Sequence, residues 1–334
     1  MVRGRPPRAV VYDRLQTAVE ELRLRLGGLP TPVEAEAIWR DIWYHEVHNS
    51  TAIEGNTLIL REVEVLLSQG RAVGAKQLRD YMEVQGYAEA ARWVYRQAME
   101  PGDWSDESLL TLTEVRHVHH AAMTPVWDVA PHELATDDER PGGFRRHNIR
   151  PFPSGMQPPD FPEVPAHMAD WLRRVQSIRE QEVPIALAVA RRHAEFERIH
   201  PFLDGNGRTG RLLMNLILVR LGFPPAIIFK RERSRYMAAL RRADEGDAGQ
   251  LGETIARAIL DNLYRFVVPA VIGAVGLVPL AALATKELSL PALRQSAIRG
   301  RLQAQRGADG QWMSSKQWLD EYVASRHRRT DNRT

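Results

Sequence analysis

Residues 199–211 read Ile-His-Pro-Phe-Leu-Asp-Gly-Asn-Gly-Arg-Thr-Gly-Arg, and this stretch carries most of what the sequence indicates. Two glycines flank Asn206 at the point where a loop enters a predicted helix over 207–221. Backbone N–H groups can therefore converge on an anion there without Cβ atoms in the way. The N-terminus of the helix adds partial positive charge. The segment thus predicts a binding site for phosphate.

Four side chains of this stretch suit chemistry on a polyphosphate. Arg208 and Arg211 lie one turn apart on one helix face, so both can reach phosphate oxygens. Asp204 supplies a carboxylate oxygen, the type of ligand that Mg²⁺ prefers. His200 is the residue of this stretch whose side-chain type is suited to accept a proton near neutral pH. Together these residues predict a phosphoryl-transfer site.

The same stretch matches the signature HPFx[DE]GNGRxxR at every position, and on these residues the chain resembles the Fic family. The resemblance implies an all-α fold, a Fic helical core with a small β-hairpin flap. It implies an ATP- and Mg²⁺-dependent transfer of AMP onto a Ser, Thr or Tyr hydroxyl of a target protein. His200 would be the general base and Asp204 the Mg²⁺ ligand. The resemblance assigns phosphate binding to Gly205, Asn206, Gly207, Arg208 and Arg211.

The segment 125–165 is rich in proline and glycine and is predicted to be a long loop with a short hairpin. Loops of this length in a compact domain are usually functional or disordered. The run 143–151 resembles the Fic flap, which holds the backbone of the target by strand addition; an ordinary surface hairpin is the alternative. The flap residues predicted to dock the target are Gly143, Phe144, Arg145, Arg146, His147, Asn148 and Ile149.

Residues 50–56, far upstream, read Ser-Thr-Ala-Ile-Glu-Gly-Asn. They resemble the motif [ST]xxxE[GN] of Fic proteins whose inhibitory helix precedes the core. The resemblance implies that Glu54 pairs with Arg211, so that ATP cannot place its α-phosphate in line for attack. Ser50 would help to hold the end of the helix. A helix with a solvated glutamate near a Gly-Asn stop is the alternative.

Several histidines and a tyrosine favour a core position over a role in the site. His193 lies two helical turns before His200 and is predicted to pack in the core or behind the site. His119 and its neighbours His117 and His120 lack a matching ligand set elsewhere, so a zinc site is not expected. Tyr236 is predicted to be a core residue, with a place in a nucleoside pocket as the alternative.

Composition excludes several classes of protein. The 334 residues include no cysteine, which excludes disulfides, thiolate zinc sites and cysteine nucleophiles. The N-terminus lacks the apolar region of a secretory signal, so a cytoplasmic protein is expected. The run 266–284 has no charged residue and is nearly long enough to span a bilayer. Two prolines and two glycines interrupt it, so no membrane partner is expected.

The basic surplus lies in the last fifty residues. From Lys286 onward there are 10 basic and 5 acidic residues, whereas the rest of the chain carries 35 and 37. A short helix over 280–286, a helix that begins near Pro291, a hairpin turning at Asp309-Gly310 and a last helix are predicted. This order is the layout of a small winged helix-turn-helix.

The predicted partner of this tail is DNA, which Arg294, Arg299 and Arg301 could contact at phosphates or base edges. A protein-docking or purely structural tail is the alternative, because fold does not fix function. Three domains are predicted in all. Residues 1–104 form an N-terminal helical region with the inhibitory motif, 105–270 the Fic catalytic core, and 280–330 the winged helix-turn-helix.

Three other functions compete with adenylylation. The same fold could remove AMP from a target, with Glu54 positioning water, or could transfer phosphate, UMP or phosphocholine. The chain could also be a DNA-binding regulator that senses nucleotide without turnover, although such a sensor has no need of His200. A homodimer is compatible with such proteins, but no pattern in this sequence indicates one.

Overall fold

The computed structural model describes residues 7–26, 28–29, 36–100, 108–152, 155–267, 277–285, 288–306, 310–316, 318–320 and 322–323. The chain divides into two compact units, Met1–Ile259 and Leu260–Thr334. No helix within the described residues has both the length and the apolar character that crossing a bilayer requires. Residues 268–276, in the middle of the uncharged run 266–284, lie outside the described residues. The finer division of the first unit at residue 104 stays a prediction.

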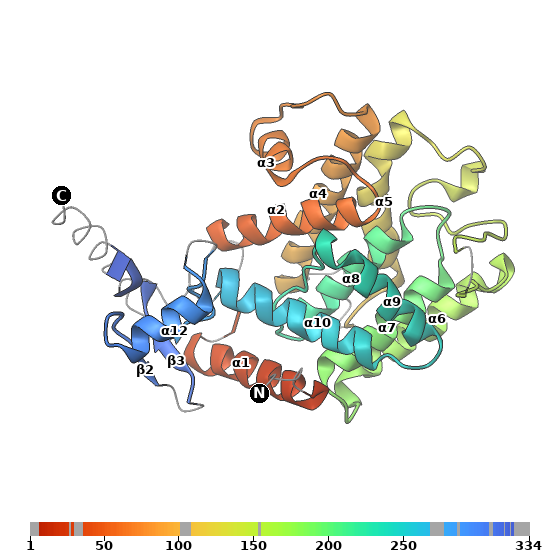
Figure 1. The fold of residues 1–334 in the computed structure, drawn as a ribbon. Coiled ribbons are helices and arrows are strands. Elements are labelled where there is room, and N and C mark those ends of the chain that lie inside the picture. Colours follow the sequence, from red (N-terminus) through yellow and green to blue (C-terminus); the bar gives the residue numbers. More distant parts are fainter. Residues whose placement is uncertain are drawn as a thin grey trace. The chain divides into compact units, whose positions relative to one another are not determined.

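Helices build the first unit, which confirms the predicted all-α fold (Figure 1). In the described part of this unit, short 3-10 turns lie between the helices: η2 (Asp137–Glu139), η3 (Phe161–Glu163), η4 (Ser177–Glu180) and η5 (Lys230–Glu232). The helices are α1 (Arg8–Leu26), α2 (Glu36–Ile53), α3 (Leu60–Gln69), α4 (Leu78–Met99), α5 (Leu112–Val129), α6 (Val164–Gln176), α7 (Ile185–Ile199), α8 (Asn206–Arg220), α9 (Arg233–Asp244) and α10 (Gly249–Asn262), the last of which ends in the second unit.

Helix α8 lies at the centre of this unit. It packs against α4, α5 and α7, and nearly all of its side chains are buried. A helix that is apolar on every side must be enclosed by others, and the run Leu-Leu-Met-Asn-Leu-Ile-Leu-Val over 212–219 has this character. The two arginines of the sequence motif, Arg208 and Arg211, are therefore buried at the first turns of a core helix.

A buried ion pair connects the C-terminal end of α8 to the start of α5. Thr111 caps α5, and Glu114 completes a capping box with it. The Glu114 carboxylate also accepts two hydrogen bonds from the Arg220 guanidinium, at 2.6 and 3.0 Å. A two-point contact of this kind fixes orientation as well as distance. It fixes the position of α8 along the core, and hence the position of its N-terminus.

Helix α5 continues through Pro125 to Val129, so the prediction of a loop from residue 125 is wrong. Proline normally interrupts a helix. Here α4 and α5 lie so close at Gly86 that a Cβ on this residue would overlap the backbone oxygen of Ala122 and lie 3.1 Å from Pro125 Cδ. Close packing of the two helices outweighs the local preference of proline.

The hairpin predicted around 143–149 does not form, because this segment contains no strand. Its backbone groups are bonded to a side chain and to the backbone of other segments rather than to a neighbouring strand. The backbone N–H of Arg146 donates to the Glu139 carboxylate (2.6 Å), and that of Arg145 donates to the Pro201 carbonyl oxygen (2.9 Å). Contacts of this kind satisfy backbone groups that a β-ladder would otherwise use. The segment is an irregular loop on the first unit.

The second unit has its own small core of Val278, Leu280, Leu283, Leu293, Ala297, Leu302 and Leu319. Helix α12 (Leu290–Ile298) is followed by β2 (Gln305–Arg306) and β3 (Trp312–Ser314), and β3 also pairs with β1 (Val278–Pro279). The order helix, then antiparallel hairpin, agrees with the sequence. Residues 280–283 form a turn rather than the predicted short helix. The assignment as a winged helix-turn-helix stays a prediction.

Candidate active site

The loop between α7 and α8 holds the predicted site in an uncommon conformation. His200 ends α7 with φ 48° and ψ 60°, a left-handed geometry that costs a non-glycine residue roughly 1–2 kcal/mol. Gly205 opens α8 with φ 77°, and a Cβ there would overlap the side chain of Met123. Asn206 closes the loop, because its side chain donates to the Phe202 oxygen (2.8 Å) and accepts from the Phe202 nitrogen (2.9 Å).

The aromatic side chain of this loop stacks on a histidine that the sequence analysis left unassigned. Phe202 is fully buried, and its ring lies 3.7 Å from that of His119 at an angle of 4°. His119 Nδ1 accepts a hydrogen bond from the backbone N–H of Gly142 (2.8 Å). Its Nε2 is therefore protonated and donates to the backbone carbonyl oxygen of Asp204 (2.9 Å). Burial lowers the pKa of His119 to about 4. This histidine therefore supports the loop as a neutral hydrogen-bonding bridge.

The hydrogen bonds of His200 fix the tautomer of its imidazole. Nδ1 lies 3.1 Å from the Glu197 carbonyl oxygen, which can only accept, so the proton is on Nδ1 and Nε2 carries a lone pair. Burial lowers the pKa of His200 to about 4, and the Arg145 charge also lowers it. A neutral imidazole with an available Nε2 is the form that a general base requires.

A cavity of about 600 Å³ lies beside this loop. It brings together every predicted catalytic, phosphate-binding and metal-binding residue, and also Glu54. Ser50 and residues 143–149 are not part of its lining. Tyr236 lines the cavity and is also buried in the core. The other lining residues that were not assigned to the site from sequence are Ile53, Pro151, Phe152, Met156, Glu197, Leu203, Arg233, Met237, Leu240 and Arg241.

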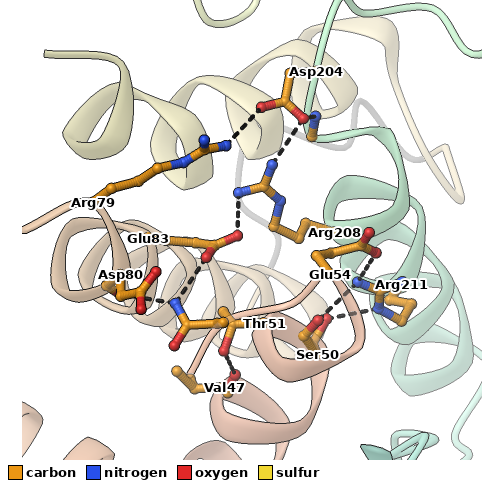
Figure 2. Close-up of polar contacts among 12 residues, drawn as sticks. Val47, Ser50, Thr51, Glu54, Arg79, Asp80, Glu83, Asp204, Arg208 and Arg211 are labelled. Atoms are coloured by element: carbon orange, nitrogen blue, oxygen red, sulfur yellow. Dashed lines mark hydrogen bonds and ion pairs between the residues drawn. The ribbon is translucent and has the colours of Figure 1, made fainter. Parts of the chain in front are cut away.

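Two carboxylates hold the first motif arginine (Figure 2). Arg208 donates to Glu83 of α4 at 2.5 Å and to Asp204 at 3.0 Å. Glu83 is fixed in turn by the Asn56 side chain, which donates to it at 2.8 Å. Burial raises the pKa of Asp204, but Arg208, the Gly205 N–H and Arg79 outweigh burial and lower it. Asp204 is therefore ionised at neutral pH.

The second motif arginine is bound by the upstream motif, so the predicted pair of Glu54 and Arg211 is present. Arg211 donates to the Glu54 carboxylate at 2.7 Å and to the Ser50 hydroxyl and carbonyl at 2.7 and 3.0 Å. Burial raises the pKa of Glu54, but the charge and hydrogen bond of Arg211 and the charge of Arg208 together outweigh burial and lower the pKa. A Cβ on Gly207 would lie 2.5 Å from Glu54 Oε1. The carboxylate thus occupies the anion site at the N-terminus of α8.

Helix α9 supplies contacts that no motif indicated. Arg233 at its start donates from Nε to the Ile53 oxygen at 2.7 Å, directly beside Glu54. One turn later, Tyr236 is 2.6 Å from His193 Nε2, and burial lowers the pKa of His193 to about 3. Glu197 is buried beside them, and burial raises its pKa to about 7. These groups come together only in the fold, and sequence spacing could not have found them.

The flap side chains that were predicted to dock a target contact their own chain. Phe144 packs on Phe202, Arg146 pairs with Asp138 at 3.3 Å, and His147 pairs with Glu139 at 2.9 Å. Arg145 is fully buried. Docking of a target by this segment stays a prediction.

The donor set fits Mg²⁺ held jointly with a polyphosphate. No group of three or more acidic or histidine side chains suited to a metal occurs in the described part of the chain. Asp204 is therefore not part of such a group. One of its carboxylate oxygens is bonded to Arg208, the other lies 4.0 Å from Arg79, and its side chain is 38% exposed. Mg²⁺ is commonly bound by one or two carboxylates together with phosphates and water. Asp204 suits that arrangement.

Comparisons with known proteins agree on one family. Residues 109–218 match the model of the Fic/DOC family. The chain is similar to Protein adenylyltransferase Fic of Drosophila willistoni, with 31% identity over 211 residues that are 62% of this chain and 38% of the relative. It is also similar to Protein adenylyltransferase fic-1 of Caenorhabditis briggsae, with 27% identity over 265 residues, 79% of this chain and 49% of the relative. The chain therefore spans less than half the length of these curated relatives.

Solved structures share the fold. Fic-1 from C. elegans has a TM-score of 0.60 and 24% identity, with 78% of this chain and 73% of that chain covered. A Fic family protein from Desulfovibrio desulfuricans has a TM-score of 0.55 and 24% identity, with 93% of this chain and 97% of that chain covered.

Proposed function

Because this chain belongs to the Fic/DOC family through residues 109–218, we propose that it is a protein adenylyltransferase that moves AMP from ATP to a Ser, Thr or Tyr hydroxyl of a target protein. The observation that carries the proposal is the neutral imidazole of His200, which opens on the same cavity as two buried arginines and a helix N-terminus. A base beside an anion site is what attack by a hydroxyl on a phosphate requires.

The proposed reaction is a single displacement at the α-phosphorus of ATP. The target oxygen forms a bond to this phosphorus, and the bond from it to the bridging oxygen of the β-phosphate breaks, so that pyrophosphate leaves. The hydroxyl proton passes to Nε2 of His200. The bond from His200 Nδ1 to the Glu197 carbonyl supports this step, because it stabilises the imidazolium that forms.

The phosphates would lie at the N-terminus of α8. The first N–H groups of a helix have no partner within it, and the helix dipole favours an anion there. Arg211 would bind phosphate oxygens once Glu54 has left, and Arg208 would do so while Glu83 and Asp204 hold its guanidinium. Asp204 would hold Mg²⁺, which neutralises phosphate charge when it is bound.

Glu54 is proposed to inhibit the reaction by substituting for a phosphate. Its carboxylate lies against Gly207 and pairs with Arg211 in the position that suits an anionic oxygen. ATP can then bind only with its phosphates displaced from Arg211. The same carboxylate favours removal of AMP as a second candidate reaction, because it lines the cavity close to His200 and its lowered pKa keeps it ionised and able to orient water.

The test of the proposed function is transfer of label from ATP that is radioactive at the α-phosphate. Wild type, Glu54→Gly and Glu54→Gly/His200→Ala would be incubated with Mg²⁺, alone and with a cell lysate, and their intact masses recorded. We expect an AMP-sized adduct with Glu54→Gly, a weak one with wild type and none with the double variant. A folded Glu54→Gly protein that binds ATP but labels neither itself nor any lysate protein would refute the proposal.

The second unit suits DNA as a partner, which we propose as a separate role. Arg294, Arg299 and Arg301 are all exposed at and after α12, where they can contact phosphates. A gel shift with random duplex DNA at physiological salt would test this, with all three arginines replaced by glutamine as the matched control. Equal binding by both forms, or by neither, would contradict the proposal. The homodimer stays a prediction.

A further inference from the structure

Arg145 is a buried cation that bonds to backbone oxygens. Its side chain is 1% exposed, and within the part of the chain that the structure describes it pairs with no carboxylate. A buried charge ordinarily needs such a partner. Here backbone oxygens replace the carboxylate, because the guanidinium donates to the carbonyl oxygens of His200 (2.9 Å), Pro159 (2.6 Å) and His147 (3.2 Å). The position of Arg145 thus depends on the backbone around the site.

The contacts of Arg145 converge on the least favourable backbone position of the first unit. His200 is the one non-glycine residue with positive φ among the described residues. Arg145 binds the carbonyl of His200 and the carbonyls on either side of it. Its Nη2 reaches the Ile199 oxygen at 3.4 Å, and its backbone N–H donates to the Pro201 oxygen at 2.9 Å. One residue thus satisfies three consecutive carbonyl groups of the turn.

This turn sets the direction of the imidazole. With His200 in the left-handed conformation, its Nδ1 lies 3.1 Å from the Glu197 oxygen at the end of α7, and its side chain lines the cavity. A right-handed residue 200 would continue α7 and carry the imidazole in another direction. The backbone conformation and the tautomer of the base are therefore coupled.

We propose that Arg145 is a positioning residue for His200, holding the base in the left-handed turn that keeps the proton on Nδ1 and leaves Nε2 at the cavity. The proposal rests on the proposed function only in giving His200 the role of base. It places Arg145, predicted from sequence to dock a target, behind the site, where it supports the backbone of His200.

The charges around His200 agree with this role. Burial lowers the pKa of the imidazole most, and the positive charge of Arg145 lowers it further, whereas the carboxylates of Glu54 and Asp204 raise it. Replacing Arg145 by a neutral residue removes one influence that disfavours the imidazolium. The pKa of His200 should therefore rise toward its ordinary value.

The experiment uses full-length Glu54→Gly protein with Arg145→Met or Arg145→Lys added. The matched control is Arg140→Met, which changes a nearby arginine that has no assigned role and whose side chain is 71% exposed. The imidazole tautomer and pKa of His200 would be measured by ¹⁵N NMR, ATP affinity by calorimetry and AMP transfer by label incorporation. We expect Arg145→Met to mix the two tautomers, raise the pKa and slow transfer on the order of 10²-fold, with ATP affinity changed less than about threefold.

Arg145→Lys should recover part of the rate, because it keeps the charge but cannot reach three carbonyls. If Arg145→Met does not fold, the tautomer of His200 in Arg145→Lys tests the proposal instead. A His200 imidazole that is protonated only on Nδ1 in that variant would overturn the proposal. An unchanged tautomer and a rate within twofold in Arg145→Met would overturn it as well. The NMR readout needs no catalysis, so it still tests Arg145 if the chain proves not to transfer AMP.

Discussion

Two buried arginines one turn apart on α8 have partners of different kinds. Arg208 pairs with Glu83, a residue of α4 whose side chain is 9% exposed and is fixed by Asn56. Arg211 pairs with Glu54, which follows the last residue of α2, precedes Gly55 (φ 108°) and is 36% exposed. Helix ends fray, whereas the interior of a packed helix does not. The first ion pair therefore belongs to the permanent structure, and the second is suited to opening.

Under the proposed function, this difference gives one helix both a fixed and a regulated phosphate ligand. Both guanidiniums are buried and both are bound before any nucleotide arrives. What distinguishes them is the segment that carries the carboxylate, not the arginine itself. Four experiments test whether the two ion pairs differ in this way.

The largest effect is expected for Glu83→Gln. This change leaves Arg208 with only Asp204, and breaking a buried ion pair costs about 3 kcal/mol of unfolding free energy. Urea denaturation would measure the loss. The matched change Glu54→Gln at the more exposed pair should cost less than about 1 kcal/mol. Equal losses in the two variants would mean that both pairs are structural.

Glu54→Gly should raise AMP transfer about tenfold. A hydrogen bond to a charged group is worth about 1.5–3 kcal/mol, and the lower end applies because the carboxylate is 36% exposed. Initial rates at subsaturating ATP would measure the effect. Glu83→Gln, which leaves Glu54 in place, should give no such increase. A faster Glu83→Gln protein would contradict the assignment of roles.

Arg233→Gln should have a smaller effect in the same direction. Arg233 binds the Ile53 oxygen at the end of α2 and is exposed, so its loss frees Glu54 by only about 0.5–1 kcal/mol. We expect basal transfer to rise two- to fourfold in the wild-type background. In a Glu54→Gly background the same substitution should give no increase, and an increase there would show that Arg233 acts by another route.

The smallest effect is expected from pH. Burial lowers the pKa of His200 to about 4, so the base is lost only as pH falls through this value. The net pKa of Glu54 is lowered as well, so its pair with Arg211 persists at all pH values above the ordinary carboxyl range. Transfer by Glu54→Gly, and its ratio to wild type, should each vary less than about twofold between pH 6 and 8. Burial raises the pKa of Glu197, which lines the same cavity, to about 7, so an inflection near pH 6.5 that persists when Glu197→Gln is added would show that the imidazole has an ordinary environment.

The residues that sequence could identify are those whose chemistry is contained in a short fixed spacing. The stretch 199–211 predicted the helix, the loop and the seven site residues of its own that line the cavity, and the motif at 50–56 predicted the pair of Glu54 with Arg211. Both motifs are local, so one sequence suffices to read them. The all-α fold followed from the same resemblance.

The residues that sequence missed depend on contacts between distant segments. Glu83 and Arg208 are 125 positions apart, and Arg233 is 180 positions from its partner Ile53. No spacing links such pairs in a single chain. The hairpin at 143–149 was wrong for a similar reason, because a side chain and the backbone of other segments bind its backbone groups in place of a strand.

Since Glu54 is carried on the same polypeptide as Arg211, its carboxylate acts at a high local concentration that is set by the chain and not by the solution. Diluting the protein cannot release it. A freely diffusing carboxylate would have to reach roughly millimolar levels to replace it. Under the proposed function the competitor is ATP, whose phosphates would bind the same arginine, so transfer by the wild-type protein should depend on ATP concentration more steeply than transfer by Glu54→Gly.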